Sequence, residues 1–271
     1  MEGNSSPSGQ DQTVGSSVVE IGPRLVVALG ALTVVAAAGG RLSGLGQGRP
    51  VVVAAVRATV QLAAVSAVLL AVVDSLILSG AFVLLMLSVA TGTAAGRVTG
   101  LSLRSPSAPR RLLSTALPIL VGAVPVVALV LGSGTVPVRG VSVIPIAGIL
   151  VGGAMTATSL AGRRMRDELA GRRGEVEAAL ALGLLRRDAV LLVARPAAAT
   201  ALVPALDQTR TVGLVTLPGA FVGVLLGGGS PLQAGAAQLL VLIGLLAAEV
   251  LAVWSVSELV ARGVLLDGVP R

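Results

Sequence analysis

The chain has 271 residues, of which 54% are apolar, only 12% are charged and 35 are glycine. Soluble domains carry about 25% charged residues, so this composition excludes an ordinary soluble protein. The mean hydropathy of +0.94 predicts instead an all-α, polytopic integral membrane protein.

The sequence contains no His, Cys or Lys. Zinc motifs and Ser-His or Cys-His catalytic pairs are therefore excluded, and so is a phosphate-binding loop with its lysine. We expect a protein that is not an enzyme and binds no cofactor, with any ATP bound by a partner subunit.

The net charge of +7 comes entirely from arginine, and the chain has two Phe, one Trp and no Tyr. Nucleic-acid binding would need aromatic side chains for base stacking, so we do not expect a nucleic-acid partner. Arginine gathered in loops is typical of membrane proteins.

The first 23 residues are polar and hold no basic residue before Arg24. We expect 1–23 to be a disordered extracytoplasmic tail rather than a secretory signal. Seven apolar stretches follow, each long enough to cross about 30 Å of hydrocarbon. They lie near 25–41, 51–73, 76–96, 113–131, 142–161, 211–229 and 234–256, and 262–271 are expected to form a cytoplasmic tail.

Arginine is distributed unevenly among the connecting loops. Those after the first and third stretches are Arg-rich, and residues 163–195 supply eight more. Because positive loops stay in the cytoplasm, this predicts the N-terminus outside and the C-terminus inside a plasma (inner) membrane. The same asymmetry favours two full crossings over a re-entrant hairpin around Val73-Asp74-Ser75.

Residues 162–210 form the one long loop of this arrangement, and a loop of that size usually has a function. Good helix formers from Glu175 end near Gly183. Asp188 is well placed as an N-cap for a second short helix, 189–195. The pattern predicts two short helices joined by a bend at Gly183.

This loop resembles the EAA loop of ABC importer permeases, in which Glu-Ala-Ala is followed by a glycine and later by Ile-x-Leu-Pro. The matching residues are Glu177, Ala178, Ala179, Gly183 and Pro196, while Val193 replaces Ile and Arg195 departs from Leu. The resemblance implies a helix that contacts a cytosolic ATPase. The alternative is a chance match in an Ala-rich amphipathic helix.

Four further stretches, at 56–62, 143–155, 172–183 and 202–238, resemble the ABC-type iron-export permeases of the FetB type. The most specific block runs from Asp207 through Arg210-Thr211-Val212-Gly213 to Leu217-Pro218-Gly219. The resemblance implies a permease transmembrane domain over 24–261 and a separate ATPase. It also implies a homodimer that exports iron or a related metal.

The sequence departs from this family where metal ligands could be sought. Ala220, Phe221 and Val222 occupy a stretch that is usually Met-rich, and Gly153 stands where Asn is common. Without His or Cys, the available ligands are carboxylates, carbonyls, Met and Gln, which suit hard cations. The metal ligands stay unassigned.

Polar residues within the apolar stretches are candidates for a transport path, because they are expensive to insert. Arg57 and Gln61 share one helical face, although Arg57 could instead extend to lipid phosphates. Asp207 and Arg210 are three residues apart at the cytoplasmic end of the expected sixth span. They form either a local ion pair or part of a gate.

Glu249 lies in the middle of the last stretch, with Arg57 as its expected partner by elimination. It could instead face outward in its protonated form, or the boundary of the span could be misplaced. Pro218-Gly219 interrupts the sixth stretch and frees backbone carbonyls, as broken helices at transport sites do. Pro118, Pro125 and Pro145 could do the same or form ordinary kinks.

Three functions remain open at this point. The first is the permease of an ABC exporter, and the second is a secondary transporter or channel with Glu249 as its cation or proton site. The third, a membrane-embedded enzyme, is disfavoured because a site would have to be built from Asp, Glu and Ser alone.

Overall fold

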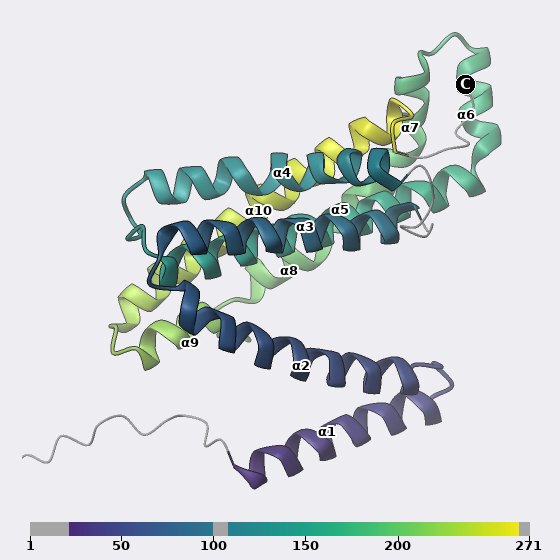
Figure 1. Ribbon diagram of the computed structural model, residues 1–271. Coiled ribbons are helices and arrows are strands. Elements are labelled where there is room, and N and C mark those ends of the chain that lie inside the picture. Colours follow the sequence, from purple (N-terminus) through teal and green to yellow (C-terminus); the bar gives the residue numbers. More distant parts are fainter. Residues whose placement is uncertain (1–21, 100–107, 266–271) are drawn as a thin grey trace, which may run out of the picture. The chain divides into compact units, whose positions relative to one another are not determined.

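The computed structural model describes residues 22–99 and 108–265, and these are helical almost throughout (Figure 1). The elements are α1 (Pro23–Leu42), α2 (Gly48–Val72), α3 (Leu76–Thr99), α4 (Ala108–Gly132), α5 (Gly140–Gly171), α6 (Arg173–Ala181), α7 (Arg186–Ala199), the 3-10 helix η1 (Thr200–Leu202), α8 (Val203–Thr211), α9 (Gly219–Leu226) and α10 (Pro231–Ala261). Within these ranges the one β pairing is an isolated bridge between Val212 and Thr216.

Seven helical segments are long and apolar enough to cross a membrane. They are Pro23–Leu42, Gly48–Val72, Leu76–Val98, Leu112–Gly132, Gly140–Gly171, Arg186–Thr211 and Pro231–Ala261. The predicted all-α, seven-span membrane fold is confirmed. The orientation of the termini stays a prediction, and the expected tail at 1–23 lies almost wholly outside the described residues, as does most of that at 262–271.

The chain divides into two units, residues 1–70 and 71–271. In the first unit, α1 and α2 are joined by a turn in which Gly44 and Gly46 have positive φ, which favours glycine. A Cβ on Gly48 would lie 2.9 Å from the Ala37 carbonyl oxygen, so the two helices meet closely at the turn. A groove of 860 Å³ lies between them.

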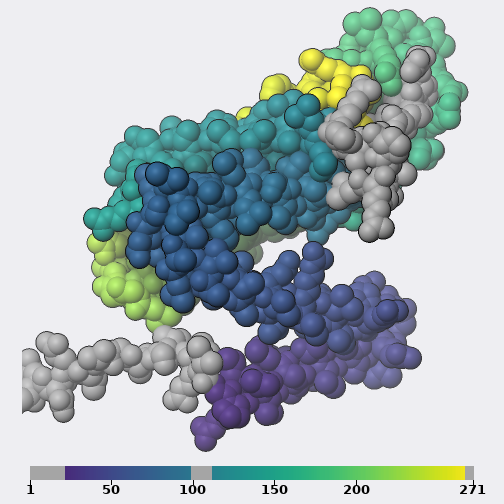
Figure 2. Space-filling model, in the orientation of Figure 1, coloured from purple at the N-terminus to yellow at the C-terminus, as the bar shows by residue number. Residues whose placement is uncertain are grey.

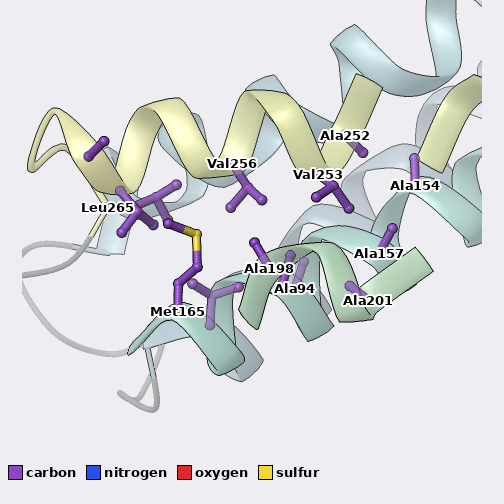
Figure 3. Packing of buried hydrophobic residues seen from close by; sticks show 14 of the residues in the cluster. Ala94, Ala154, Ala157, Met165, Ala198, Ala201, Ala252, Val253, Val256 and Leu265 are labelled. Carbon is purple, nitrogen blue, oxygen red and sulfur yellow. The ribbon is translucent and has the colours of Figure 1, made fainter. Parts of the chain in front are cut away.

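In the second unit, α5 is the central helix and contacts α3, α4, α7 and α10. Figure 3 shows Ala157 and Met165 of α5 converging with Ala198 of α7 and with Val253 and Val256 of α10. Small and β-branched residues dominate this core. Helices pack closely through such residues, as membrane helices do when no hydrophobic effect drives them together.

Helices α4, α5 and α10 approach one another closely at Gly122. A Cβ on this glycine would lie 2.5 Å from the Ala248 carbonyl oxygen, 3.0 Å from the Ala252 Cβ and 3.2 Å from the Ala154 Cβ. The three helices therefore meet where only hydrogen fits. Pro118, Pro125 and Pro145 lie inside α4 and α5, and both helices continue through them.

The sixth span differs from its predicted position at 211–229. The sixth long apolar helix is α7, η1 and α8 in succession, Arg186–Thr211, and the expected stretch holds only the turn 212–218 and the eight-residue α9. Arg186, Arg187 and Arg195 led to its assignment as part of a loop, although its most apolar window has a mean hydropathy of 1.8, equal to that of α5. Pro218-Gly219 was expected to interrupt the sixth span, but Pro218 is the N-cap of the separate short helix α9 and lies after the end of the sixth long helix at Thr211.

Candidate functional site

A corner joins α5 to α6 through Arg172. Its guanidinium donates to Glu168 of α5 at 2.8 Å and to Glu175 of α6 at 2.6 Å. The Arg172 hydrogen bond lowers the pKa of Glu175, and the two carboxylates raise the pKa of Arg172. One side chain thus links the two helices in an exposed position, where each ion pair alone stabilises little.

The bend after α6 is a glycine-dependent helix end. Gly183 has φ +89°, its N–H donates to the Leu180 carbonyl, and the Leu184 N–H donates to the Ala179 carbonyl. These two bonds define a Schellman motif, which needs a left-handed residue at the glycine position. The bend predicted at Gly183 is confirmed.

The Glu-Ala-Ala residues divide between the two sides of α6. Ala179 is buried with Val176, whereas Ala178 is exposed. Glu177 is also exposed and is paired with Arg173 at 3.0 Å. The helix is therefore anchored by its apolar side and presents a carboxylate on the other.

The α6–α7 corner also exposes large apolar side chains. Leu182 is 82% exposed and Leu185 is 73% exposed, one on each side of Gly183. Figure 2 shows this corner at one end of the second unit, beyond the bundle of long helices. Leucines exposed on a protruding and firmly held corner are typical of a surface that binds a partner.

Helix α7 begins at Arg186 with Leu185 as its N-cap, so the prediction of Asp188 as N-cap was wrong. Asp188 lies instead in the first turn, where it accepts from Arg187 at 2.8 Å. Arg187 also donates to both carboxylate oxygens of Glu258, at 2.9 and 2.5 Å. This bidentate pair ties the start of α7 to the end of α10.

Pro196 is an exposed residue inside α7 rather than at its end. It lines a 480 Å³ groove with Leu192 and Arg195 on the same helix. The second short helix was expected to end at residue 195, just before this proline. Helix α7 instead continues through Pro196 to Ala199.

Asp207 and Arg210 form the local ion pair that their spacing predicts, at 3.2 Å and with both side chains largely exposed. They lie near the end of α8, whereas the expected sixth span placed them at its start. The chain direction along Arg186–Thr211 puts this pair at the opposite end of the helix from the α6–α7 corner.

The turn after α8 is held by a residue that sequence reasoning missed. Gln238 of α10 is buried, and its side-chain carbonyl accepts a hydrogen bond from the Phe221 N–H of α9 at 3.2 Å. The first N–H groups of a helix lack partners within the helix, so Gln238 satisfies one of them. A glutamine inside an apolar span was the signal that could have found it.

Glu249 lies inside the second unit, with 9% of its surface exposed. A Cβ added to Gly153 of α5 would lie 3.1 Å from the Glu249 Oε1, so the absence of a side chain there leaves room for the carboxyl group. The alternative of an outward-facing carboxyl is wrong. Glu249 forms no hydrogen bond or ion pair with another described residue.

Arg57 and Gln61 lie on α2 in the first unit, and both are exposed there. The pairing of Arg57 with Glu249 stays a prediction. Two other buried polar atoms, Thr158 Oγ1 and Ser159 Oγ on α5, were missed; neither has a hydrogen-bond partner in the part of the chain that the structure describes.

No three Asp or Glu side chains come together as a metal-binding group within residues 22–99 and 108–265. The turn 212–218 separates α8 from α9, and two of its carbonyls accept backbone hydrogen bonds, Thr216 from Gly213 and Pro218 from Val222.

Seven long apolar helices, a carboxyl group buried at Glu249 and a short helix that is hydrogen-bonded to a buried glutamine define a multi-pass membrane protein of the transport class. The family model described as "Uncharacterised protein family (UPF0014)" matches residues 24–265. The chain belongs to this family.

Several relatives share part of the sequence. The chain is 38% identical over 157 residues to "UPF0014 membrane protein STAR2" of Oryza sativa subsp. japonica. This alignment covers 58% of this chain and 54% of the relative. It is 40% identical over 159 residues to "Protein ALUMINUM SENSITIVE 3" of Arabidopsis thaliana, covering 59% and 56%.

It is also 32% identical over 143 residues to "Probable iron export permease protein FetB" of Escherichia coli (strain K12), covering 53% and 55%. The resemblance to the FetB type is thereby confirmed. The chain aligns with about half the length of these curated relatives. No solved structure matches it.

Proposed function

We propose that this chain is the membrane-spanning permease subunit of an ATP-driven ABC exporter. The observation that carries the proposal is the α6–α7 corner, with Leu182 and Leu185 exposed on either side of a rigid glycine bend. A cytosolic ATPase would bind this corner, hold ATP and transmit its closure to α5 and α10. The chain itself would bind no nucleotide.

The substrate that we propose is iron or a related metal, because one relative is named as a probable iron export permease. Two copies of the chain and two ATPases would form the transporter, with the path lined by oxygen ligands. Hard cations prefer such ligands.

The first test is purification of the tagged full chain in mild detergent. We expect an ATPase with a phosphate-binding loop to co-purify in equal amount and its ATP hydrolysis to respond to iron. If no ATPase co-purified under conditions that preserve such complexes, the proposal would be wrong.

The second test uses two variants in the corner, Glu177→Arg and Gly183→Pro. Proline fixes φ near −65°, which is incompatible with +89° at Gly183, so the bend cannot form. We expect both variants to insert normally but to lose most metal-stimulated ATP hydrolysis. Gly174→Ala is the control on the same helix, since its methyl group would meet nothing within 4 Å. Normal stimulation in both variants would refute the coupling role.

A secondary transporter or channel is the second candidate, and the buried carboxyl of Glu249 favours it. In that case an ion gradient alone would drive transport in vesicles that lack any ATPase, and Glu249→Gln would abolish it. Transport that requires ATP and its ATPase would reject this candidate, whatever the effect of Glu249→Gln.

A further inference from the structure

A third groove lies between α7 with η1 and the last turns of α10. It has a volume of 350 Å³, and its walls are mainly apolar, with Leu202 on one side and Val250 and Val253 on the other. A cationic, an aromatic and an anionic side chain also line it: Arg195, Trp254 and Glu258.

Arg195 is the cation that lines this groove, and it has no partner among residues 22–99 and 108–265. It is exposed and forms no ion pair with any residue that the structure describes. Glu258, by contrast, is engaged on both oxygens by Arg187 and contacts Arg262 at 3.5 Å. The carboxylate is therefore already neutralised, and the guanidinium of Arg195 is available to an anion.

Trp254 is the only tryptophan of the chain and is 60% exposed beside the groove. Tryptophan is enriched where hydrocarbon meets the lipid headgroups. The apolar run of α10 ends near residue 256, and Glu258 and Arg262 follow it. The groove therefore lies where the apolar part of the bundle gives way to its arginine-rich end.

We propose that this groove binds an anionic phospholipid. The phosphate pairs with Arg195, while an acyl chain lies along Leu202, Val250 and Val253 beside the Trp254 ring. Basic pockets between membrane helices bind anionic headgroups in this way, and each nearby arginine contributes about 1 kcal/mol. The site is independent of the proposed function, because it requires neither the ATPase nor a transported metal.

Trp254 also provides the test, because all tryptophan fluorescence of the chain comes from this groove. The full chain is reconstituted into phosphatidylcholine vesicles that contain increasing fractions of brominated phosphatidylglycerol or brominated phosphatidylcholine. Bromine quenches the fluorescence of a tryptophan that it contacts. We expect the anionic lipid to be preferred about fivefold, which is the ratio that about 1 kcal/mol gives.

Arg195→Gln should reduce this preference to about onefold while leaving quenching by brominated phosphatidylcholine unchanged. That unchanged quenching also shows that the variant is folded with Trp254 in place. Arg173→Gln is the control, since Arg173 is another exposed arginine, on α6, and does not line the groove. It should retain the full preference.

Three results would overturn the proposal. Equal quenching by both lipids in the unmodified chain would mean that no selective site exists. An unchanged preference in Arg195→Gln would mean that Arg195 does not bind the phosphate. Fluorescence that neither lipid quenches would mean that protein, such as a second copy of the chain, covers the groove.

Discussion

Gly122 and Gly152 are two helical glycines of the same bundle with opposite surroundings. A methyl group on Gly122 would meet the Ala248 carbonyl oxygen and the Ala252 Cβ of α10, whereas one on Gly152 would meet nothing within 4 Å. A backbone oxygen cannot move aside as a flexible side chain can. The two positions therefore separate the effect of packing from the effect of helix propensity.

We expect Gly122→Ala to destabilise the bundle by about 1–3 kcal/mol, because α4 and α10 must move apart. Gly152→Ala should instead stabilise it by about 0.5–1 kcal/mol, since alanine favours the helix. Thermal unfolding in detergent measures both. Similar melting temperatures for the two variants would show that the helices do not meet at Gly122 as described.

Glu249 shows how far a single residue can be predicted. A charged residue in an apolar run indicated a carboxyl group inside the membrane protein, and Glu249 is buried as expected. Its neighbour Gly153 comes from another helix, and only the register between α5 and α10 brings them together. That register depends on side-chain packing over the whole helix, which a single sequence does not display.

At the scale of elements, the ion pair between Arg187 and Glu258 is a side-chain link between the start of α7 and the end of α10. It spans 71 residues of sequence and is bidentate. Such geometry makes arginine–carboxylate pairs both stronger and more specific in orientation. The pair should therefore hold the start of α7 in place.

We expect Arg187→Glu and Glu258→Arg each to lower the melting temperature, because each places like charges together. The double charge swap should recover part of the loss, since the pair re-forms in the opposite sense. A swap at Asp207 and Arg210, a more exposed pair within one helix, is the control and should change little. Losses that simply add in the double variant would show that the two residues do not interact.

The helical elements were predictable to different degrees. Six of the seven long helices overlap the apolar stretches identified in the sequence, and the bend at Gly183 follows from a glycine after a run of helix formers. The sixth helix was misplaced because its arginines, Arg186, Arg187 and Arg195, were assigned to a loop. A helix can carry such side chains when they stay exposed or form ion pairs, as Arg187 does. Asp188 was a plausible cap, but α7 begins at Arg186, three residues before the predicted start at Ala189.

At the scale of the whole molecule, the absence of cysteine provides a clean test of orientation. Val138→Cys, in the loop before α5, and Leu182→Cys, in the α6–α7 corner, both replace exposed residues. The arginine asymmetry predicts that a membrane-impermeant thiol reagent labels Val138→Cys in intact cells and labels Leu182→Cys only after the membrane is opened. The reverse pattern would invert the topology and remove the α6–α7 corner from the cytosolic ATPase.

Helix α5 runs from Gly140 to Gly171, and it approaches α4 closely at Ala154. That point lies about 21 Å from one end of the helix and about 26 Å from the other, at about 1.5 Å per residue. The close approach at Ala154 therefore divides α5 into two segments of similar length. Any tilt of α5 about Ala154 would therefore move its two ends by similar distances in opposite directions, so that the motion which narrows one end of the bundle widens the other.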